Sequence, residues 1–201
     1  MKFRATFFVV LVAGFFAAFG VAQACEGYKD QSTEDLKAYR DKLAQADADP
    51  LDKFFAFQEL YCSSNPVLRA YAAKAGLESN ADPIIRQQIM LILLLDMKHV
   101  VVEITPAKNS TANDKQFIAR NDGKIDYISR YASESDGCIS IYADDKCYVN
   151  RALFIKGDTV KLYDDQLYGE FTLSDSNDLS GYVRIYNGDG YGRIPAVIRL
   201  N

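Results

Sequence analysis

The sequence predicts an α+β fold, in which about four N-terminal helices pack on a C-terminal antiparallel β-sandwich or barrel. Apolar residues in the first part recur at helical spacing, and Asp-Pro or Asn-Pro pairs mark helix starts there. After residue 98, short β-branched and aromatic runs alternate with turn residues. We therefore expect a leader at 1–24, a helical segment at 25–98 and an antiparallel β-domain at 99–201.

Four helices are expected before residue 98. The first starts near Ser32, which precedes Asp35 by three residues in an arrangement like a capping box. Each of the others starts at a capping residue followed by proline, whose missing N–H costs nothing at the first helical position. The short spacing between these starts favours antiparallel neighbours. The three starts are Asp49-Pro50, Asn65-Pro66 and Asp82-Pro83.

The last expected helix contains the apolar run IMLILLL at residues 89–95. A run of this length is too short to span a bilayer, which needs about 20 apolar residues. A helix that is apolar all round is typical of a protein core. We therefore expect a buried central helix against which the β-domain packs.

The stretches NPVLRAYAAKAGL at 65–77 and DPIIRQQIMLILL at 82–94 resemble the helices of HEAT-type repeats, in which a D/N-P-x-x-R start is common. The resemblance covers residues 49–97, and two or three helices are too few for a free-standing solenoid. HEAT repeats bind proteins, so the resemblance implies a protein partner. It does not assign the whole chain to a family.

The second part of the chain is expected to form strands. A strand at 99–104 precedes an exposed polar loop at 105–115. Pro195 cannot donate to a ladder, so the last strand is expected at a sheet edge or a bulge. Further strands are expected at 116–120, 124–131, 138–142, 147–156, 159–163, 167–174, 179–187 and 191–200.

Residues 1–24 have the pattern of a secretory signal peptide. Two basic residues precede a long apolar run, which ends in the small-residue cleavage site Ala22-Gln23-Ala24. We expect cleavage after Ala24 and a periplasmic or secreted protein with no transmembrane segment in the mature chain. Two alternatives stay open, a retained membrane helix and lipidation of Cys25. Lipoprotein signals usually carry a large aliphatic residue where Ala22 stands.

Four cysteines in an exported chain predict two disulfides, and three pairings are possible. We favour Cys25–Cys62 and Cys138–Cys147, because each pair lies within one half of the chain. A tight hairpin at 144–145 would leave the second pair roughly 13 Å apart, beyond the limit of about 7 Å between Cα atoms. Either residues 139–146 loop out, or this pairing is wrong. A zinc site is the rival interpretation, but no C-x-x-C motif is present.

Charge argues against two classes of partner. The formal net charge is −4, and loss of the two basic leader residues would make it −6. Nucleic-acid binding needs basic patches that neutralise phosphates, and anionic membranes also attract basic segments. We therefore expect no nucleic-acid partner and no anionic membrane surface.

Catalytic and metal-binding signatures are weak. The chain has no G-x-S-x-G or S-x-x-K motif and no expected free thiolate. The lone histidine, His99, is expected to be structural or solvent-facing. Most aspartates fall in expected turns, where they bond locally. We therefore expect no cofactor, no metal and no catalytic residue.

Alternation along the last strands assigns aliphatic residues to an inner face and a tyrosine-arginine set to an outer face. Tyrosine and arginine are enriched in binding hot spots, although cross-strand pairs of these residues also stabilise sheets. The candidate binding residues of the outer face are Tyr168, Tyr182, Arg184, Tyr186, Tyr191, Arg193 and Arg199.

The sequence is most consistent with a non-enzymatic protein that binds another envelope or secreted protein, as an inhibitor, immunity protein or adaptor. A glycan- or peptidoglycan-binding module that uses the same tyrosines is the first alternative. A hydrolase with two carboxylates, whose pair would be assembled only in space, is the second.

Overall fold

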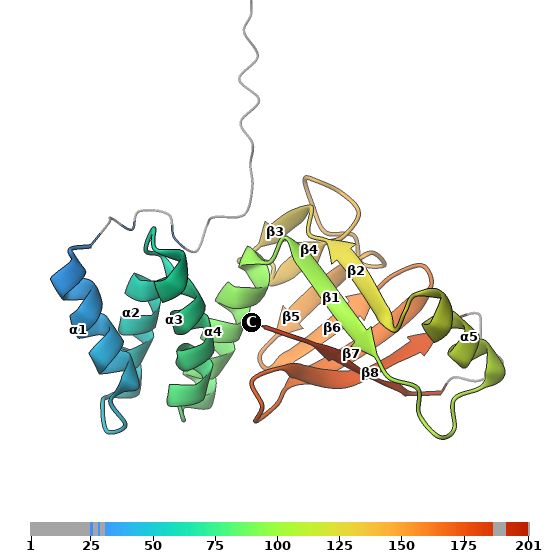
Figure 1. Cartoon of the computed structure of the whole chain (residues 1–201). Coiled ribbons are helices and arrows are strands. Elements are labelled where there is room, and N and C mark those ends of the chain that lie inside the picture. Colours follow the sequence, from blue (N-terminus) through green and yellow to red (C-terminus); the bar gives the residue numbers. More distant parts are fainter. Residues whose placement is uncertain (1–24, 26–27, 29–30, 187–191, 201) are drawn as a thin grey trace, which may run out of the picture.

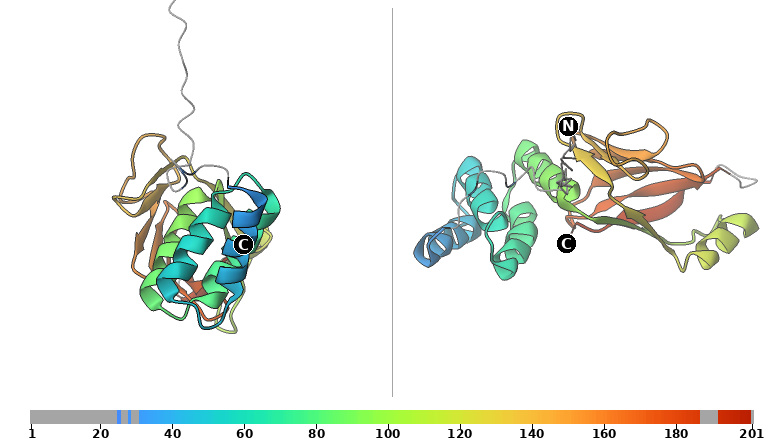
Figure 2. Two further views of the ribbon diagram at one scale, coloured as in Figure 1. Left: turned by 90° about the vertical axis from the view of Figure 1, so that its left-hand side faces the viewer. Right: turned by 90° about the horizontal axis from the view of Figure 1, so that it is seen from above.

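The computed structural model describes residues 25, 28, 31–186 and 192–200. The expected signal peptide at 1–24 lies outside the described residues. Four helices stand side by side, and the fourth lies against a bent antiparallel sheet (Figure 1). Seen from above, helices and sheet follow one another along one long axis, with a fifth helix at the far end of the sheet (Figure 2). The expected α+β fold is confirmed.

The helices begin where local capping chemistry predicts. The side chains of Asp49, Asn65 and Asp82 each accept backbone N–H bonds at a helix start, and a proline follows each of them. The first four helices are α1 (Thr33–Ala44), α2 (Pro50–Tyr61), α3 (Pro66–Ser79) and α4 (Pro83–Asp96). In the part of the chain that the structure describes, no helix has the length and apolarity needed to cross a membrane.

The nine strands of the described residues form one sheet in the order β2-β1-β9-β8-β7-β6-β5-β4-β3. Every neighbouring pair is antiparallel, and β2 and β3 are the two edge strands. The sheet curls into an open half-barrel (Figures 1 and 2). Its strands are β1 (His99–Ile104), β2 (Lys124–Ile128), β3 (Tyr131–Ser133), β4 (Cys138–Ser140), β5 (Ala152–Lys156), β6 (Thr159–Tyr163), β7 (Leu167–Leu173), β8 (Leu179–Ile185) and β9 (Ile194–Ile198).

The inner face of the sheet and helix α4 share one hydrophobic core. Six of the seven residues in the run 89–95 are buried, as expected for a central helix. Phe171 and Val183, from the inner face, belong to the same buried cluster. A polar contact also joins the two layers, because the Arg86 guanidinium donates to the Ser174 carbonyl at 3.0 Å.

Several details of the β-domain differ from the sequence-based expectation. Residues 116–120, expected as a strand, lie in helix α5 (Ala112–Arg120), and the expected loop at 105–115 contains the start of that helix. The Thr111 side chain accepts from the Asp114 N–H, while Asp114 accepts from the Thr111 N–H. This capping box stabilises a helix in which aromatic and β-branched residues alone favoured a strand. The expected strand at 124–131 is divided between β2 and β3.

Pro195 is expected to mark a sheet edge or a bulge. The edge is wrong, since β9 lies between β8 and β1, and the register of β9 with β8 runs through Pro195 without an extra residue. The Pro195 carbonyl accepts from the Thr105 N–H at 3.0 Å, so this residue directs its backbone polar groups toward β1. Strand β1 ends at Ile104, and Pro195 therefore stands where the ladder with β1 stops. A missing N–H is tolerated at that point.

Both favoured disulfides are present, Cys25–Cys62 and Cys138–Cys147. The Cα atoms of the second pair are 6.5 Å apart, because residues 141–151 loop out instead of forming a tight hairpin. The Cys25 sulfur is bonded to Cys62, so it is not free to carry a thioether-linked lipid. Two disulfides are compatible with an exported protein.

Candidate functional site

The outer face of strands β5 to β9 carries a continuous row of side chains. Strand register places Lys161 opposite Glu170, Glu170 opposite Tyr182, and Tyr182 opposite Pro195. A second row places Tyr163 opposite Tyr168. Paired residues of an antiparallel ladder project to the same side, so both rows share one face.

Aromatic rings extend along this face across four strands. The ring centroids of Phe154 and Tyr163 are 6.0 Å apart, those of Tyr163 and Tyr168 are 5.3 Å apart, and those of Tyr168 and Tyr182 are 6.5 Å apart. Successive ring planes are inclined by 71°, 58° and 61°. Two of these ring pairs are edge to face and the pair Tyr163–Tyr168 is tilted, so the rings do not form a flat platform.

Glu170 connects the central tyrosines. Its Oε2 atom accepts from the Tyr168 hydroxyl at 2.7 Å and from the Tyr182 hydroxyl at 3.2 Å. The bond from Tyr168 lowers the pKa of Glu170 most, and Tyr182, Lys161 and Arg193 lower it further against partial burial. Burial, followed by the bond to Glu170, raises the pKa of Tyr168. Glu170 is thus held as an ionised acceptor, and Tyr168 as a neutral donor.

Two arginines lie over the ring of Tyr182. The guanidinium carbon of Arg193 is 4.5 Å from the ring centroid, and that of Arg184 is 5.5 Å from it. These distances are within the range of cation–π attraction. Continuing the register Val183↔Ile194 by one residue places Arg184, on β8, opposite Arg193, which directly precedes β9. We call Tyr163, Tyr168, Glu170, Tyr182, Arg184 and Arg193 the Tyr/Arg cluster.

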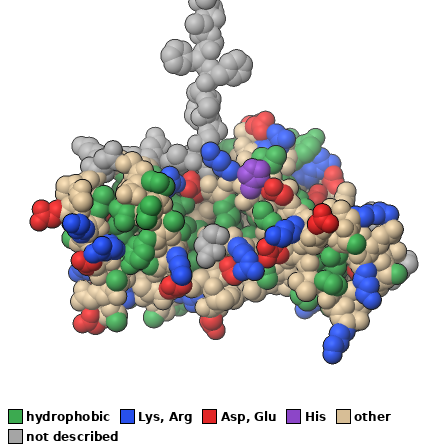
Figure 3. All heavy atoms as spheres, viewed as in Figure 1, with side chains coloured by type: hydrophobic (Ala, Val, Ile, Leu, Met, Phe, Trp, Pro, Cys, Tyr) green, Lys and Arg blue, Asp and Glu red, His purple; other side chains and the backbone are tan. Residues whose placement is uncertain are grey.

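The outer face around the Tyr/Arg cluster is positively charged. Its strand positions on β5 to β9 carry four cations, Lys156, Lys161, Arg184 and Arg193, and one carboxylate, Glu170, among the described residues. The chain as a whole has a net charge of −4. Over β1 and β2, by contrast, basic and acidic side chains alternate around the histidine (Figure 3). The outer face of β5 to β9 therefore has a local excess of positive charge on a chain that is acidic as a whole.

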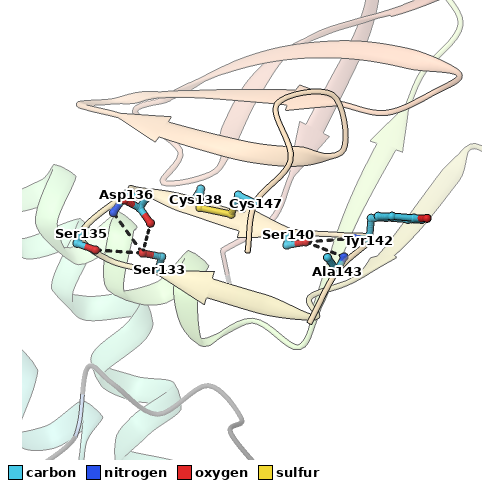
Figure 4. Close-up of a disulfide and its surroundings, with 8 residues drawn as sticks. All are labelled: Ser133, Ser135, Asp136, Cys138, Ser140, Tyr142, Ala143 and Cys147. Atoms are coloured by element: carbon cyan, nitrogen blue, oxygen red, sulfur yellow. Dashed lines mark hydrogen bonds between the residues drawn. A yellow bond between two sulfur atoms is a disulfide. The ribbon is translucent and has the colours of Figure 1, made fainter. Parts of the chain in front are cut away.

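One end of the outer face is covered by residues 141–151, which we call the stapled loop. Cys138, Ser140 and Ala152 are fully buried although they lie in the outer rows, and the disulfide ties Cys147 to this side (Figure 4). The Ser140 hydroxyl accepts the N–H groups of the first turn of the loop. The loop exposes the aromatic side chains of Tyr142 and Tyr148.

Exposed aromatic rings of the stapled loop are held by cations. The rings of Tyr142 and Tyr148 meet edge to face at 6.0 Å. Arg151 lies 4.2 Å from the ring of Tyr142 and also forms a salt bridge with Asp165 in the β6–β7 turn. The loop therefore presents preordered aromatic surface at the end of the outer face.

The predicted site residues divide into three groups. Tyr168, Tyr182, Arg184 and Arg193 lie together in the Tyr/Arg cluster. Tyr186 follows the end of β8 and is 50% exposed. Arg199 lies apart from them and forms salt bridges with Glu103 and Asp178. Tyr191 lies outside the described residues.

Sequence reasoning missed several residues of the outer face. Lys161 and Tyr163 alternate with the buried Val160 and Leu162, so the same period of two could have found them. The aromatic residues of the stapled loop have no such signal, since an irregular loop has no periodic pattern.

A metal site requires several ligating side chains in a defined geometry. Among the residues that the structure describes, no group of three or more His, Cys, Asp or Glu side chains is arranged to hold a metal ion. His99 is exposed, as expected, and its Nδ1 atom lies 3.0 Å from an Asp126 oxygen on the neighbouring strand.

Comparison of the chain with protein-family models, curated proteins and solved structures found no match. The HEAT-type resemblance of residues 49–97 therefore rests on the helix-start motifs alone. A function for this chain has to be inferred from the geometry of its outer face.

Proposed function

We propose that this is an exported, disulfide-bonded protein that binds another protein of the cell envelope through the Tyr/Arg cluster, as an inhibitor, immunity protein or adaptor, without catalysis. The observation that carries the proposal is the arrangement around Tyr182. Two guanidinium groups lie over its ring, and its hydroxyl shares the Glu170 carboxylate with Tyr168. Tyrosine and arginine contribute a large share of binding energy in protein interfaces.

The contacts within the cluster also reduce the cost of binding. Ordering a side chain at an interface costs about 0.5–1.5 kcal/mol. The hydrogen bonds to Glu170 and the stacked guanidinium groups already restrict these side chains in the free protein. A preordered surface binds a partner with less loss of conformational entropy.

Site-specific photo-crosslinking in the native host tests this proposal. A benzophenone amino acid replaces Tyr186, which is 50% exposed beside the cluster, and in a control it replaces Phe55, which is 53% exposed on helix α2. We expect position 186 to form one discrete adduct with a protein, and position 55 not to form that adduct. Adducts that are absent or identical at the two positions would contradict the proposal.

Two substitutions then test whether binding depends on the tyrosines. Replacing Tyr182 and Tyr186 with Ser should abolish co-purification of the crosslinked partner. The free energy of unfolding should fall by no more than about 2 kcal/mol, because both side chains contact solvent. Retention of the partner by a folded double variant would show that the outer face is not the binding surface.

The alternative function for the Tyr/Arg cluster is glycan binding. Sugars stack on accessible ring faces, and the inclined rings of the cluster offer no coplanar platform, which favours a protein partner. Soluble peptidoglycan and polysaccharide fragments provide the discriminating measurement. A ligand that prefers the native state must raise the melting temperature, by an amount that follows from its concentration and Kd.

A further inference from the structure

Among the residues that the structure describes, Arg184 and Arg193 have no carboxylate partner, whereas several other arginines do. Arg151, for example, forms a two-point contact with Asp165, at 3.0 Å and 2.5 Å. Within the described ranges, neither Arg184 nor Arg193 forms a salt bridge. In the described part of the chain, both guanidinium groups lie near the ring of Tyr182, and the charge of Arg193 also interacts with that of Glu170.

This arrangement is unfavourable in the free protein. Like charges placed opposite each other on neighbouring strands destabilise a sheet. The Nε atom of Arg184 is also buried and has no hydrogen-bond partner within the described part of the chain. A buried donor without an acceptor costs about 1–3 kcal/mol. An anion bound beside the two guanidinium groups would reduce the repulsion between them.

The geometry points to an anion subsite at Arg184 and Arg193 that takes a side-chain carboxylate from an acidic segment of the partner. This inference rests on the proposed function, because it names the chemistry of the protein that the Tyr/Arg cluster binds. A guanidinium group is a planar fork of donors that matches the two oxygens of a carboxylate. Cation–π attraction to the Tyr182 ring restricts the positions of both groups in the free protein.

The remaining cations indicate a peptide with more than one carboxylate. Lys161 is exposed on β6, two strands from β8 and thus about 10 Å away. Side chains on one face of an extended peptide are about 7 Å apart, so two acidic residues can reach both positions. Nucleic acid fits less well, because four outer-face cations on an acidic chain neutralise few phosphates.

Calorimetric titration of the oxidised protein with hexaglutamate at low ionic strength tests the subsite. Hexaglutamine is the neutral control peptide, and hexagalacturonate represents an anionic glycan. We expect hexaglutamate to bind, hexaglutamine not to bind, and added salt to weaken the binding by screening. Hexagalacturonate should bind at least tenfold more weakly than hexaglutamate.

Substitutions locate the binding. The double variant R184Q/R193Q should bind hexaglutamate at least about tenfold more weakly, as expected for lost charge-assisted bonds. The matched control R40Q/R120Q removes two exposed arginines from helices α1 and α5 and should change Kd less than twofold. The variant R184K/R193K keeps the charge but loses the planar fork, so its Kd should be intermediate.

Three results would overturn the inference. These are no binding of hexaglutamate, equal losses in R184Q/R193Q and R40Q/R120Q, or tighter binding of hexagalacturonate, which would make the ligand a glycan. The crosslinking result at position 186 is independent of this titration. A discrete adduct without hexaglutamate binding would retain the protein partner and reject its acidic chemistry. Arginine-dependent hexaglutamate binding without an adduct would reject the proposed function and leave an anion site.

Discussion

The two faces of strands β6 to β8 are built from alternate residues of the same chain, yet their side chains have different roles. The inner face presents Leu162, Phe171 and Val183, which are fully buried. The outer face presents Tyr168, Tyr182 and their charged neighbours, which contact solvent. Volume and apolarity determine the inner residues, because a core must be filled. Folding places weaker demands on the outer residues, so a tyrosine-arginine set there is available for recognition.

The largest loss of stability is expected from a substitution on the inner face. Phe171 is fully buried, and its ring occupies the space over Gly169, where an added Cβ atom would lie 2.7 Å from it. Phe171→Ala should lower the free energy of unfolding by about 3–5 kcal/mol, through lost burial and a residual cavity. Urea denaturation measures the change.

The matched substitution on the outer face is Tyr182→Ala, on the neighbouring strand. It should cost less than about 2 kcal/mol, because the ring is only partly buried and loses mainly ring and cation–π contacts. Equal losses for the two variants would mean that the outer face is packed as a second core.

Removal of either disulfide is also expected to lower the free energy of unfolding. The two disulfides restrain different parts of the chain. Cys25–Cys62 ties the start of the described chain to the helices across a separation of 37 residues, and Cys138–Cys147 closes a separation of 9 residues on the outer face. On the chain-entropy model, C25S/C62S should cost about 4 kcal/mol and C138S/C147S about 3 kcal/mol. Thermal unfolding without reductant measures both losses.

A second readout separates the local role of Cys138–Cys147 from its contribution to stability. Limited proteolysis of C138S/C147S should cut first within 141–151, because the loop loses its tie to the sheet. The C25S/C62S variant is the control and should not gain these cleavage sites. Resistance of the loop in C138S/C147S would mean that the salt bridge between Arg151 and Asp165 is enough to hold it.

The smallest expected effect is the contribution of Glu170, on the outer face, to the pH dependence of stability. The pKa of Glu170 is lowered in the folded protein from an ordinary value of 4.5. Its contribution to stability is therefore complete above about pH 4.5 and is lost as the pH falls through the lowered pKa. Glu170→Gln should flatten the acid limb of the stability curve in that window, by a small amount because the group is partly solvated. Identical acid limbs would contradict this assignment.

The hydroxyl groups that lower this pKa can be ranked. Tyr168→Phe should raise the pKa of Glu170 more than Tyr182→Phe, because the bond from Tyr168 is the larger cause and the shorter contact. Carbon-13 NMR titration of the Glu170 carboxyl group measures both changes. The opposite order would mean that Tyr182 is the principal donor.

Prediction from sequence succeeded where the signal was local. Asp49, Asn65 and Asp82 cap their own helices, so a few neighbouring residues were enough to place α2, α3 and α4. It was wrong for 116–120, because Phe117 and Ile118 have the intrinsic preference of a strand. The capping box at Thr111 and Asp114 outweighs that preference.

The amino-acid sequence by itself determined the helix starts and the alternation that separates inner from outer residues. These depend on chemistry between residues close in the chain. Only the tertiary structure decided that β9 lies between β1 and β8, that Phe154 and Tyr163 extend the aromatic row, and that Arg184 faces Arg193 over Tyr182. Strand order and register decide such contacts, and both are set by packing between distant segments, which no local pattern records.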